Sequence, residues 1–238
     1  MAPTSIFFDM DDTLLDGVSA MTTAWNTICG EFGPRLGCEP EALRLAIRTQ
    51  SELFWRNEAA VETEWRTRLV EAREHVVRLT LECEGWDTDV ARTIAEGYST
   101  EHRRLLTLFE DSLQTLECLR SGGFHLGLIT NGPAAMQRDK IDRFGLEQYF
   151  DVIVIEGEFG AGKPSDKVFR HALSATGAAP EAAWHVGDNL YADVGGAKAV
   201  GIHGVWIHRD RLEMKEGAAA IPDRVIGHLP ELCEALGV

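Results

Sequence analysis

The residues best suited to chemistry lie close to the start of the chain. A short apolar run, Ile6-Phe7-Phe8, leads directly into Asp9-Met10-Asp11-Asp12-Thr13. Because open α/β sheets bind ligands at the carboxyl ends of their strands, Asp9 and Asp11 are predicted to reach one pocket. Two neighbouring carboxylates repel each other unless they share a cation or a proton. The pattern favours a magnesium site in which a nucleophile and an acid/base lie side by side.

Three further segments carry polar residues at or just after the end of an apolar run. Thr130-Asn131-Gly132-Pro133 combines a hydroxyl with a free backbone N–H at a predicted helix start, which is a ready anion site. Gly160-Ala161-Gly162-Lys163-Pro164 holds a lysine in a glycine-rich loop before a helix. Gly187-Asp188-Asn189-Leu190-Tyr191-Ala192-Asp193 holds two carboxylates five residues apart in a predicted strand-to-helix turn.

The elements that must position these segments alternate along the chain. Strands are predicted at residues 5–9, 124–130, 152–155, 184–187 and 204–207. Helices are predicted at residues 112–121, 133–144, 165–176, 190–200 and 229–236. This alternation predicts a parallel sheet with helices on both faces. The predicted fold class is therefore α/β, with a Rossmann-like, doubly wound sheet.

The region from about residue 18 to about residue 104 contains no convincing strand. Its clearest helix has an apolar stripe from Val61 to Cys83 opposite a charged face, and Gly85 follows as a stop. Shorter helical patterns occupy residues 19–32, 40–56 and 88–104. Since the first strand needs partners that lie beyond residue 110, we expect the helical block to be an insertion. The predicted domains are residues 1–16 with 106–238, and residues 17–105.

The composition limits the class of protein. The chain has 238 residues, 45% of them hydrophobic, and a net charge of −15, which disfavours nucleic-acid binding. An anionic substrate would need a local cation or a metal. Five scattered cysteines without a CxxC pair indicate free thiols in a reducing compartment. The early Asp9 excludes a signal peptide or membrane span at the start, so we expect a cytoplasmic protein.

In this order, the four segments resemble the haloacid dehalogenase superfamily of phosphohydrolases. The match covers roughly residues 5–16 and 110–210. The family pattern is an aspartate pair two residues apart followed by Thr, then Ser or Thr, then Lys, then Gly-Asp with a further acid. Each part is weak alone because short motifs recur by chance, but all four in order form a strong signal. The chemistry agrees, because phosphoryl transfer depends on positioning and on well-placed cations.

The resemblance implies a catalytic role for four residues and a substrate-binding role for a fifth, Asn131. Asp9 would be the nucleophile that forms an aspartyl-phosphate, and Asp11 would protonate the leaving oxygen and then activate water. Thr130 and the Asn131 N–H would bind phosphate oxygens. Lys163 would neutralise charge on Asp9 and on the transferred group, and would contact the substrate.

The resemblance also implies a set of metal ligands. Mg²⁺ would be bound by Asp9, by the backbone carbonyl of Asp11 and by Asp188. Asp193 would support either the metal or the catalytic lysine, and Thr13 would support the first segment. Carboxylate and water ligands suit magnesium, and nothing in the sequence suggests a zinc site.

The spacing predicts where a cap domain would be inserted. Positions 9 and 130 are 121 residues apart, whereas positions 130 and 163 are only 33 apart. The resemblance places a cap in one of these gaps, and only the first is large enough. The helical block would then be an all-helical cap, with hinges at Gly17 and near residues 105–110, that closes to exclude water. The candidates for facing the substrate are Trp25, Phe54, Trp55, Arg56 and Asn57. Packing in the helical core is the stronger interpretation for each of them.

The leading interpretation is a magnesium-dependent phosphomonoesterase, monomeric or homodimeric, that acts on a small phosphorylated metabolite. Residues 129–132, 149–151 and 162–164 are most similar to phosphatases of nucleoside monophosphates, acyl-sugar phosphates and phosphoglycolate. A 2-haloacid dehalogenase on the same fold is disfavoured, because such enzymes typically lack an acid at the Asp11 position. A sugar phosphomutase remains open, since it uses the same intermediate. A non-catalytic phospho-ligand binding module is disfavoured because every matching position is intact.

Overall fold

The computed structural model describes residues 3–56, 65, 68–209 and 219–238. The chain divides into two compact units, one formed by Met1–Asp16 with Leu108–Val238 and the other by Gly17–Thr107. The first unit contains the sheet and the second is helical.

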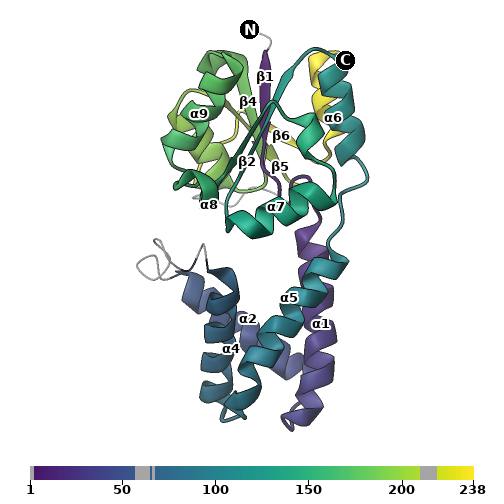
Figure 1. Cartoon of the computed structure of the whole chain (residues 1–238), viewed down its shortest axis with the longest axis vertical. Coiled ribbons are helices and arrows are strands. Elements are labelled where there is room, and N and C mark those ends of the chain that lie inside the picture. Colours follow the sequence, from purple (N-terminus) through teal and green to yellow (C-terminus); the bar gives the residue numbers. More distant parts are fainter. Residues whose placement is uncertain (1–2, 57–64, 66–67, 210–218) are drawn as a thin grey trace. The chain divides into compact units, whose positions relative to one another are not determined.

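The sheet of the first unit has six strands in the order β3-β2-β1-β4-β5-β6, and every neighbouring pair is parallel (Figure 1). The strands are β1 (Ser5–Phe8), β2 (His125–Thr130), β3 (Val152–Ile155), β4 (Ala183–Gly187), β5 (His203–Ile207) and β6 (Arg224–Ile226). This confirms the predicted doubly wound α/β fold. Strand β6 is absent from the prediction, because two of its three residues are exposed and no apolar run marks it.

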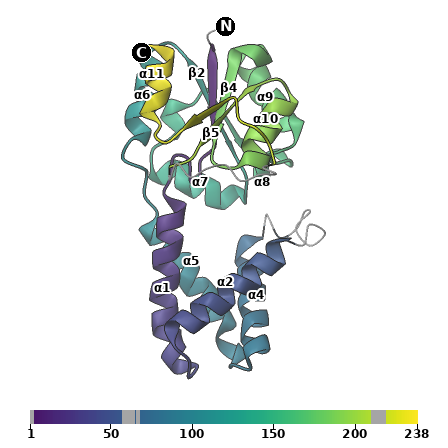
Figure 2. The same cartoon turned by 180° about the vertical axis from the view of Figure 1, so that it is seen from behind.

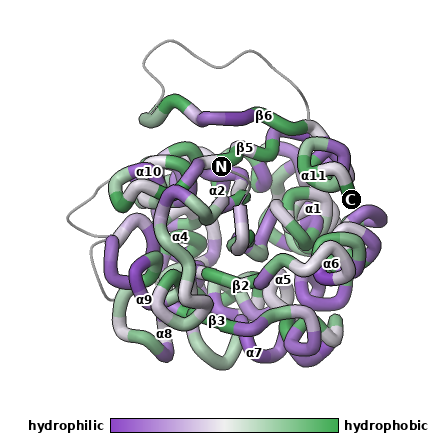
Figure 3. The backbone as a smooth tube through the Cα atoms, turned by 90° about the horizontal axis from the view of Figure 1, so that it is seen from above, coloured by the Kyte–Doolittle hydropathy of each residue, from purple (hydrophilic) through white to green (hydrophobic). Residues whose placement is uncertain are grey.

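Helices cover both faces of this sheet. They are α6 (Ser112–Ser121), α7 (Ala134–Arg143), α8 (Glu156–Phe159), α9 (Asp166–Thr176), α10 (Gly196–Ala199) and α11 (Pro230–Leu236), with short turns of helix at Glu147–Tyr149, Pro180–Ala182 and Leu190–Gly195. Figures 1 and 2 show α9 and α10 on one face and α6 and α11 on the other. Residues of β1, β2 and β3 form a core with α9, in which Phe7 and Phe169 are fully buried. Figure 3 shows β3 in the hydrophobic colour although it lies at an edge of the sheet.

The helical unit contains α1 (Gly17–Arg35), α2 (Pro40–Arg56), α4 (Leu69–Glu84) and α5 (Ala91–Leu105), with a short turn at Thr88–Val90. Its described residues include no strand, as the sequence predicts. The four helices share one core, which contains Ile28, Leu43, Val77 and Ile94.

The predicted helix from Val61 to Cys83 is wrong at its start. Val61 lies outside the described residues, Trp65 lies in a turn, and α4 begins only at Leu69. Arg68 precedes it with a non-helical backbone and no side-chain cap, so no capping residue marks the start in the sequence. The end is as predicted, because Gly85 adopts a left-handed conformation with φ of 71° and closes the helix.

Two further expectations concern the chain as a whole. All five cysteines are free thiols. Among the described residues, none of the helices combines the length and the apolar character that crossing a bilayer would require.

Candidate active site

The four polar segments meet at one edge of the sheet. Asp9 directly follows β1, Thr130 ends β2 and Gly187 ends β4, and β1 lies between β2 and β4 as a parallel neighbour of both. Their carboxyl ends therefore point the same way. The backbone N–H of Asp9 donates to the Val186 carbonyl at 2.9 Å, which ties the first segment to the fourth.

Lys163 lies at the centre of this site. Its side chain is buried, and its ammonium group donates to Asp9 Oδ1 and lies 2.6 Å from Asp193 Oδ1. Burial alone would lower the pKa of Lys163, but the charges of Asp193 and Asp9 outweigh this effect and raise it. Lys163 is therefore a fixed positive charge beside the predicted nucleophile. On the other side of that nucleophile, Thr13 Oγ1 lies 3.5 Å from Asp9 Oδ2.

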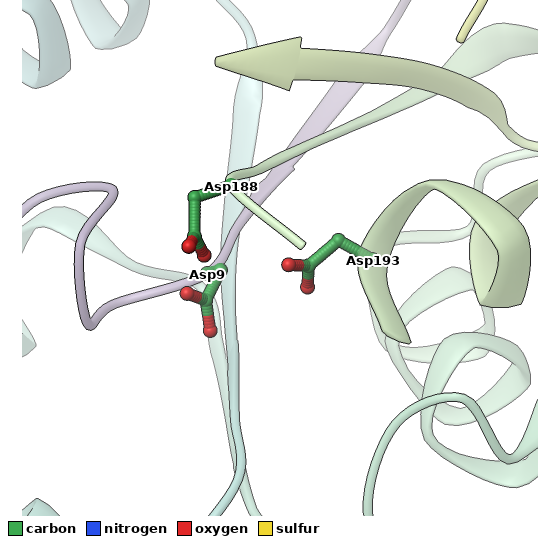
Figure 4. A group of neighbouring side chains, drawn as sticks. All are labelled: Asp9, Asp188 and Asp193. Atoms are coloured by element: carbon green, nitrogen blue, oxygen red, sulfur yellow. The ribbon is translucent and has the colours of Figure 1, made fainter. Parts of the chain in front are cut away.

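Three carboxylates form a compact acidic group. One oxygen each from Asp9, Asp188 and Asp193 can be chosen so that all three atoms lie within 4.8 Å of one another, and Figure 4 shows the three side chains turned toward a common point. Burial raises the pKa of Asp9 well above its ordinary value, helped by Asp193 and Asp188 and opposed by Lys163. The ionised form of Asp9 is therefore disfavoured unless a further positive charge lies beside it.

The other two acids respond differently to the same surroundings. Asp188 is exposed as a residue, but partial desolvation of its carboxyl group, with Asp193 and Asp12 nearby, raises its pKa to about 7. Burial also acts to raise the pKa of Asp193, yet Lys163 and His185 outweigh it and hold that pKa below its ordinary range. A hard, oxygen-seeking divalent cation such as Mg²⁺ fits this donor set, because it would offset the uncompensated charge.

The three carboxylates comprise two predicted metal ligands and one residue predicted to support the site. Asp9 and Asp188 lie together as expected, and Asp193, predicted only in a supporting role, contributes its carboxylate to the same group. Asp193 also pairs with Lys163, the second of its two predicted supporting roles.

The side chain of Asp11 is held by helix α7. Lys140 Nζ lies 2.7 and 2.8 Å from the two carboxylate oxygens of Asp11, and Gln137 Nε2 donates to Asp11 Oδ2 at 3.0 Å. The same Gln137 amide donates to Thr130 Oγ1 at 2.6 Å, so it bridges the predicted acid/base and the predicted phosphate-binding hydroxyl. Both α7 residues are absent from the sequence prediction. Their signal is spacing, because residues three apart share one face of the helix that follows Thr130.

Asn131 connects the second segment to the third. Its Oδ1 accepts from the backbone N–H of Lys163 at 2.7 Å, and its Nδ2 donates to the Lys163 carbonyl at 2.9 Å. Glu156 Oε2 accepts from the Gly132 N–H at 2.9 Å on the same side. A Cβ at position 162 would lie 2.6 Å from Glu156 Oε1 and 2.8 Å from Asn131 Oδ1, so a larger residue there would displace both side chains from their hydrogen bonds. The glycine-rich loop thus allows the two segments to pack closely and fixes the backbone of Lys163.

The fourth segment is built around Asp193. A Cβ at position 187 would lie 2.3 Å from Asp193 Cγ, so Gly187 leaves the space that this carboxylate occupies. Asn189 donates its backbone N–H to Asp193 Oδ2 at 3.0 Å. His185 is a buried β4 residue, and its Nε2 lies 3.0 Å from Asp193 Oδ1. Burial lowers the pKa of His185, which favours the neutral imidazole.

The predicted substrate-facing residues of the helical unit belong mainly to aromatic clusters. Trp25 stacks on Tyr98 with ring centroids 4.2 Å apart and packs against the helical core. Phe54 meets Trp55 edge-on at 5.0 Å. Arg56 is exposed, and Asn57 lies outside the described residues. A role of these side chains toward a substrate stays a prediction.

The sequence of this chain matches one protein family and is similar to proteins named as phosphatases. Residues 6–207 match the family described as haloacid dehalogenase-like hydrolase. The chain is 35% identical over 254 residues to a phosphoserine phosphatase from Thermus thermophilus, covering 97% of this chain and 99% of that protein. It is 30% identical over 240 residues to a glyceraldehyde 3-phosphate phosphatase from Pyrococcus furiosus, covering 97% and 92%.

Solved structures show the same similarity in three dimensions. A HAD phosphatase from Thermococcus onnurineus has a TM-score of 0.66 at 29% identity, with 100% of this chain and 98% of that chain covered. A 2-haloacid dehalogenase from Pseudomonas syringae has a TM-score of 0.63 at 30% identity, with coverage of 100% and 99%. Phosphate-ester and carbon–halogen chemistry are thus both represented among the similar chains.

Proposed function

The chain belongs to the haloacid dehalogenase-like hydrolase family, and from this premise we propose that it is a phosphoric monoester hydrolase. In this proposal it removes phosphate from a small phosphorylated metabolite through an aspartyl-phosphate on Asp9, with Mg²⁺ as cofactor. The observation that supports it most is the buried Lys163 ammonium, which contacts both Asp9 and Asp193 while Asp188 lies within the same acidic group. The phosphatase names of the similar proteins support the same choice.

The first half of the reaction transfers the phosphoryl group to the protein. A carboxylate oxygen of Asp9 forms a bond to phosphorus while the ester P–O bond breaks. Asp11 donates its proton to the leaving oxygen, so that the alcohol departs neutral. Lys163 offsets the charge on Asp9 and on the phosphoryl oxygens, and the Thr130 hydroxyl and the Asn131 N–H bind those oxygens.

The second half returns Asp9 to its starting form. Asp11, now ionised, takes a proton from a water molecule whose oxygen forms a bond to phosphorus. The bond between phosphorus and the Asp9 oxygen breaks, and inorganic phosphate leaves. Gln137 keeps Asp11 and Thr130 in register during both halves, because it donates to both side chains.

Mg²⁺, when bound, supplies positive charge that offsets the carboxylates and the phosphoryl oxygens. In the proposal, Asp9, Asp188 and the Asp11 carbonyl hold it, with the Asp193 carboxylate beside them. We also propose that the helical unit, Gly17–Thr107, is the cap of this enzyme.

A 2-haloacid dehalogenase is the second candidate, because a solved structure that is 30% identical to this chain carries that name. In that chemistry Asp9 would attack carbon and release a halide, and neither Asp11 nor a metal would be required. The carboxylate at Asp11, held by Lys140 and Gln137, favours the phosphatase instead.

The test measures three products from one preparation, namely free phosphate, chloride and any isomerised sugar phosphate. Free phosphate is assayed with Mg²⁺ across a panel that contains phosphoserine, glyceraldehyde 3-phosphate, nucleoside monophosphates and phosphoglycolate, and chloride is assayed with 2-chloropropionate. We expect phosphate release from at least one member and no chloride release. Chloride without phosphate would establish the dehalogenase, an isomerised sugar phosphate would establish a mutase, and no product at all would favour a binding module.

The Asp9→Asn variant serves as the blank. We expect it to lose at least about a thousandfold in kcat while its unfolding curve stays close to that of the wild type, because the amide cannot act as the nucleophile. Asp142→Asn, an exposed substitution on α7, is the matched control and should keep full activity. Turnover by Asp9→Asn at the normal rate would remove Asp9 from its proposed role.

Removal of divalent cations tests the cofactor separately. EDTA should stop phosphate release, and added Mg²⁺ should restore it, because the acidic group then regains its counter-charge. Hydrolysis that continues at full rate in EDTA would rule out a required metal in this site.

A further inference from the structure

A pocket lined by described residues lies wholly within the helical unit. It has a volume of about 550 Å³ and is lined by residues of α1, α2, α4 and α5. This volume falls in the range of pockets that bind small organic molecules. Trp25, Trp55 and Tyr98 contribute to its wall, together with aliphatic side chains such as Ile47 and Val76. The wall therefore suits a flat, apolar body.

The pocket also contains cationic side chains, two of which already have carboxylate partners. Arg44 binds Glu41 through two contacts of 2.5 and 2.8 Å. Arg48 Nε donates to Glu52 at 2.9 Å. These two guanidinium groups are neutralised within their own helix, so they offer little unbalanced charge to a ligand.

Arg73 is the exception among the pocket arginines. Its Nη1 donates to Ser99 Oγ at 2.7 Å, and its guanidinium carbon lies 4.5 Å from the centre of the Tyr98 ring. Among the residues that the structure describes, Arg73 forms an ion pair with no carboxylate, although it is half-buried. Desolvation by burial lowers the pKa of Arg73 and outweighs the opposing effect of Tyr98. A guanidinium has five N–H donors in a planar fork, so Arg73 has donors left for an anionic ligand.

The surroundings of Arg73 hold it in one position. Ser99 donates its own hydroxyl to the Ala95 carbonyl at 2.8 Å and is therefore oriented to accept from Arg73. Tyr98 in turn stacks on Trp25 at 4.2 Å. A fixed cation beside a rigid aromatic surface loses little conformational entropy when a ligand binds.

We propose that this pocket binds an organic anion with a flat apolar body, whose carboxylate or phosphate pairs with Arg73 and whose body packs against Trp25 and Trp55. The anion comes from one of two sources. It is either the organic part of a phosphorylated substrate or a separate metabolite that binds the helical unit. The pocket residues belong to one unit, so binding of the anion can be tested within that unit, and only the first of the two sources rests on the proposed function.

Calorimetric titration with a matched pair of probes tests the proposal. Indole-3-acetate carries the required anion, and indole-3-acetamide has nearly the same shape without the charge. The full-length protein should bind the acid about tenfold more tightly than the amide, because a hydrogen bond to a charged group contributes more than one to a neutral group. Equal affinity for the two probes, or no binding of either at millimolar concentration, would overturn the proposal.

Two variants of helix α4 locate the charge. Arg73→Gln should lose the preference for the acid, whereas Arg78→Gln, which removes an arginine already paired with Glu74 at 2.9 Å, should keep it. Trp55→Ala should weaken both probes together, because it removes part of the apolar wall. Circular dichroism checks that each variant folds. If Arg73→Gln does not fold, the ratio of the wild-type affinities for the acid and the amide still tests the proposal. An Arg73→Gln variant that keeps the tenfold preference would show that the anion binds elsewhere.

A kinetic arm distinguishes the two sources. Hydrolysis of p-nitrophenyl phosphate is measured with and without indole-3-acetate. A raised KM at constant kcat identifies the pocket anion as part of a substrate, and binding without competition identifies a separate ligand. Only this arm rests on the proposed phosphatase activity, so its failure leaves the calorimetric result intact.

Discussion

The two units of the molecule use the same kinds of charged residue in opposite ways. In the α/β unit, the side chains of Lys163, Asp9 and Asp193 are 3%, 10% and 2% exposed and form one connected network. In the helical unit, Arg92 and Glu96 are 72% and 54% exposed and form a pair one helical turn apart. Water screens the charges of the exposed pair. The charges of the buried network are compensated only by one another, because water is excluded from them. Burial therefore decides which charges are essential.

The largest effect should come from removing the central cation. Lys163→Met leaves Asp9 and Asp193 without their ammonium partner in a buried site. We expect phosphate release to fall by at least about a thousandfold and the free energy of unfolding to fall by about 3–5 kcal/mol. Urea titration and a phosphate assay measure the two effects. Lys167→Met, on the exposed side of α9, is the control and should change neither.

Activity of Lys163→Met within tenfold of the wild type would contradict the comparison. It would mean that a buried network in this unit matters no more than an exposed pair.

An intermediate effect should come from a residue that positions the site without carrying charge. Gln137→Leu removes the donor shared by Asp11 and Thr130. We expect kcat to fall roughly tenfold to a hundredfold with little change in KM, because the two groups lose their mutual alignment rather than their identity. Steady-state kinetics separates the two constants. Gln148→Leu, which removes an exposed amide that donates to the Gly145 carbonyl, should leave both constants unchanged.

A Gln137→Leu variant with a changed stability but an unaltered kcat would assign this residue a purely structural role. The distinction sharpens the comparison, because it separates the network that performs chemistry from the surrounding hydrogen bonds.

The smallest effect should come from the exposed pair. Arg92→Gln breaks the contact with Glu96, whose partner atoms lie 2.7 Å apart. We expect no measurable change in Tm or in phosphate release, because pairs of this kind contribute little in water. Thermal unfolding at low and high salt measures the Tm, and a phosphate assay measures the activity. A fall in Tm of more than about 3 °C would show that the surface pairs of the helical unit matter more than their exposure implies.

Much of the α/β unit could be predicted because its signals are local. Each of the four polar segments lies where an apolar run ends, and the apolar runs for β1 to β5 are legible in the sequence. Strand β6 has no such run, since Arg224 and Val225 are exposed and only Ile226 is buried. The start of α4 lacks a capping residue, so its apolar stripe alone placed the start too early.

The sequence predicted which segments contribute side chains to the candidate site, but it did not predict which atoms contact one another. Asp9, Lys163 and Asp188 follow from their segments. The spacing of Gln137 and Lys140 places both on one face of α7, but it does not reveal their partner, because Asp11 is more than 120 positions away along the chain.

By itself, the sequence determined the order of strands β1 to β5 and the segments that carry the acids, the lysine and the glycines, because each depends on neighbouring residues. The tertiary structure decided the partners. The packing of distant segments decides which oxygen faces Lys163 and brings Asp193 close to Asp9. It also leaves Arg73 without a described carboxylate partner. The physical reason is that electrostatic and hydrogen-bond energies depend on distance in space and on burial, and neither is encoded in separation along the chain.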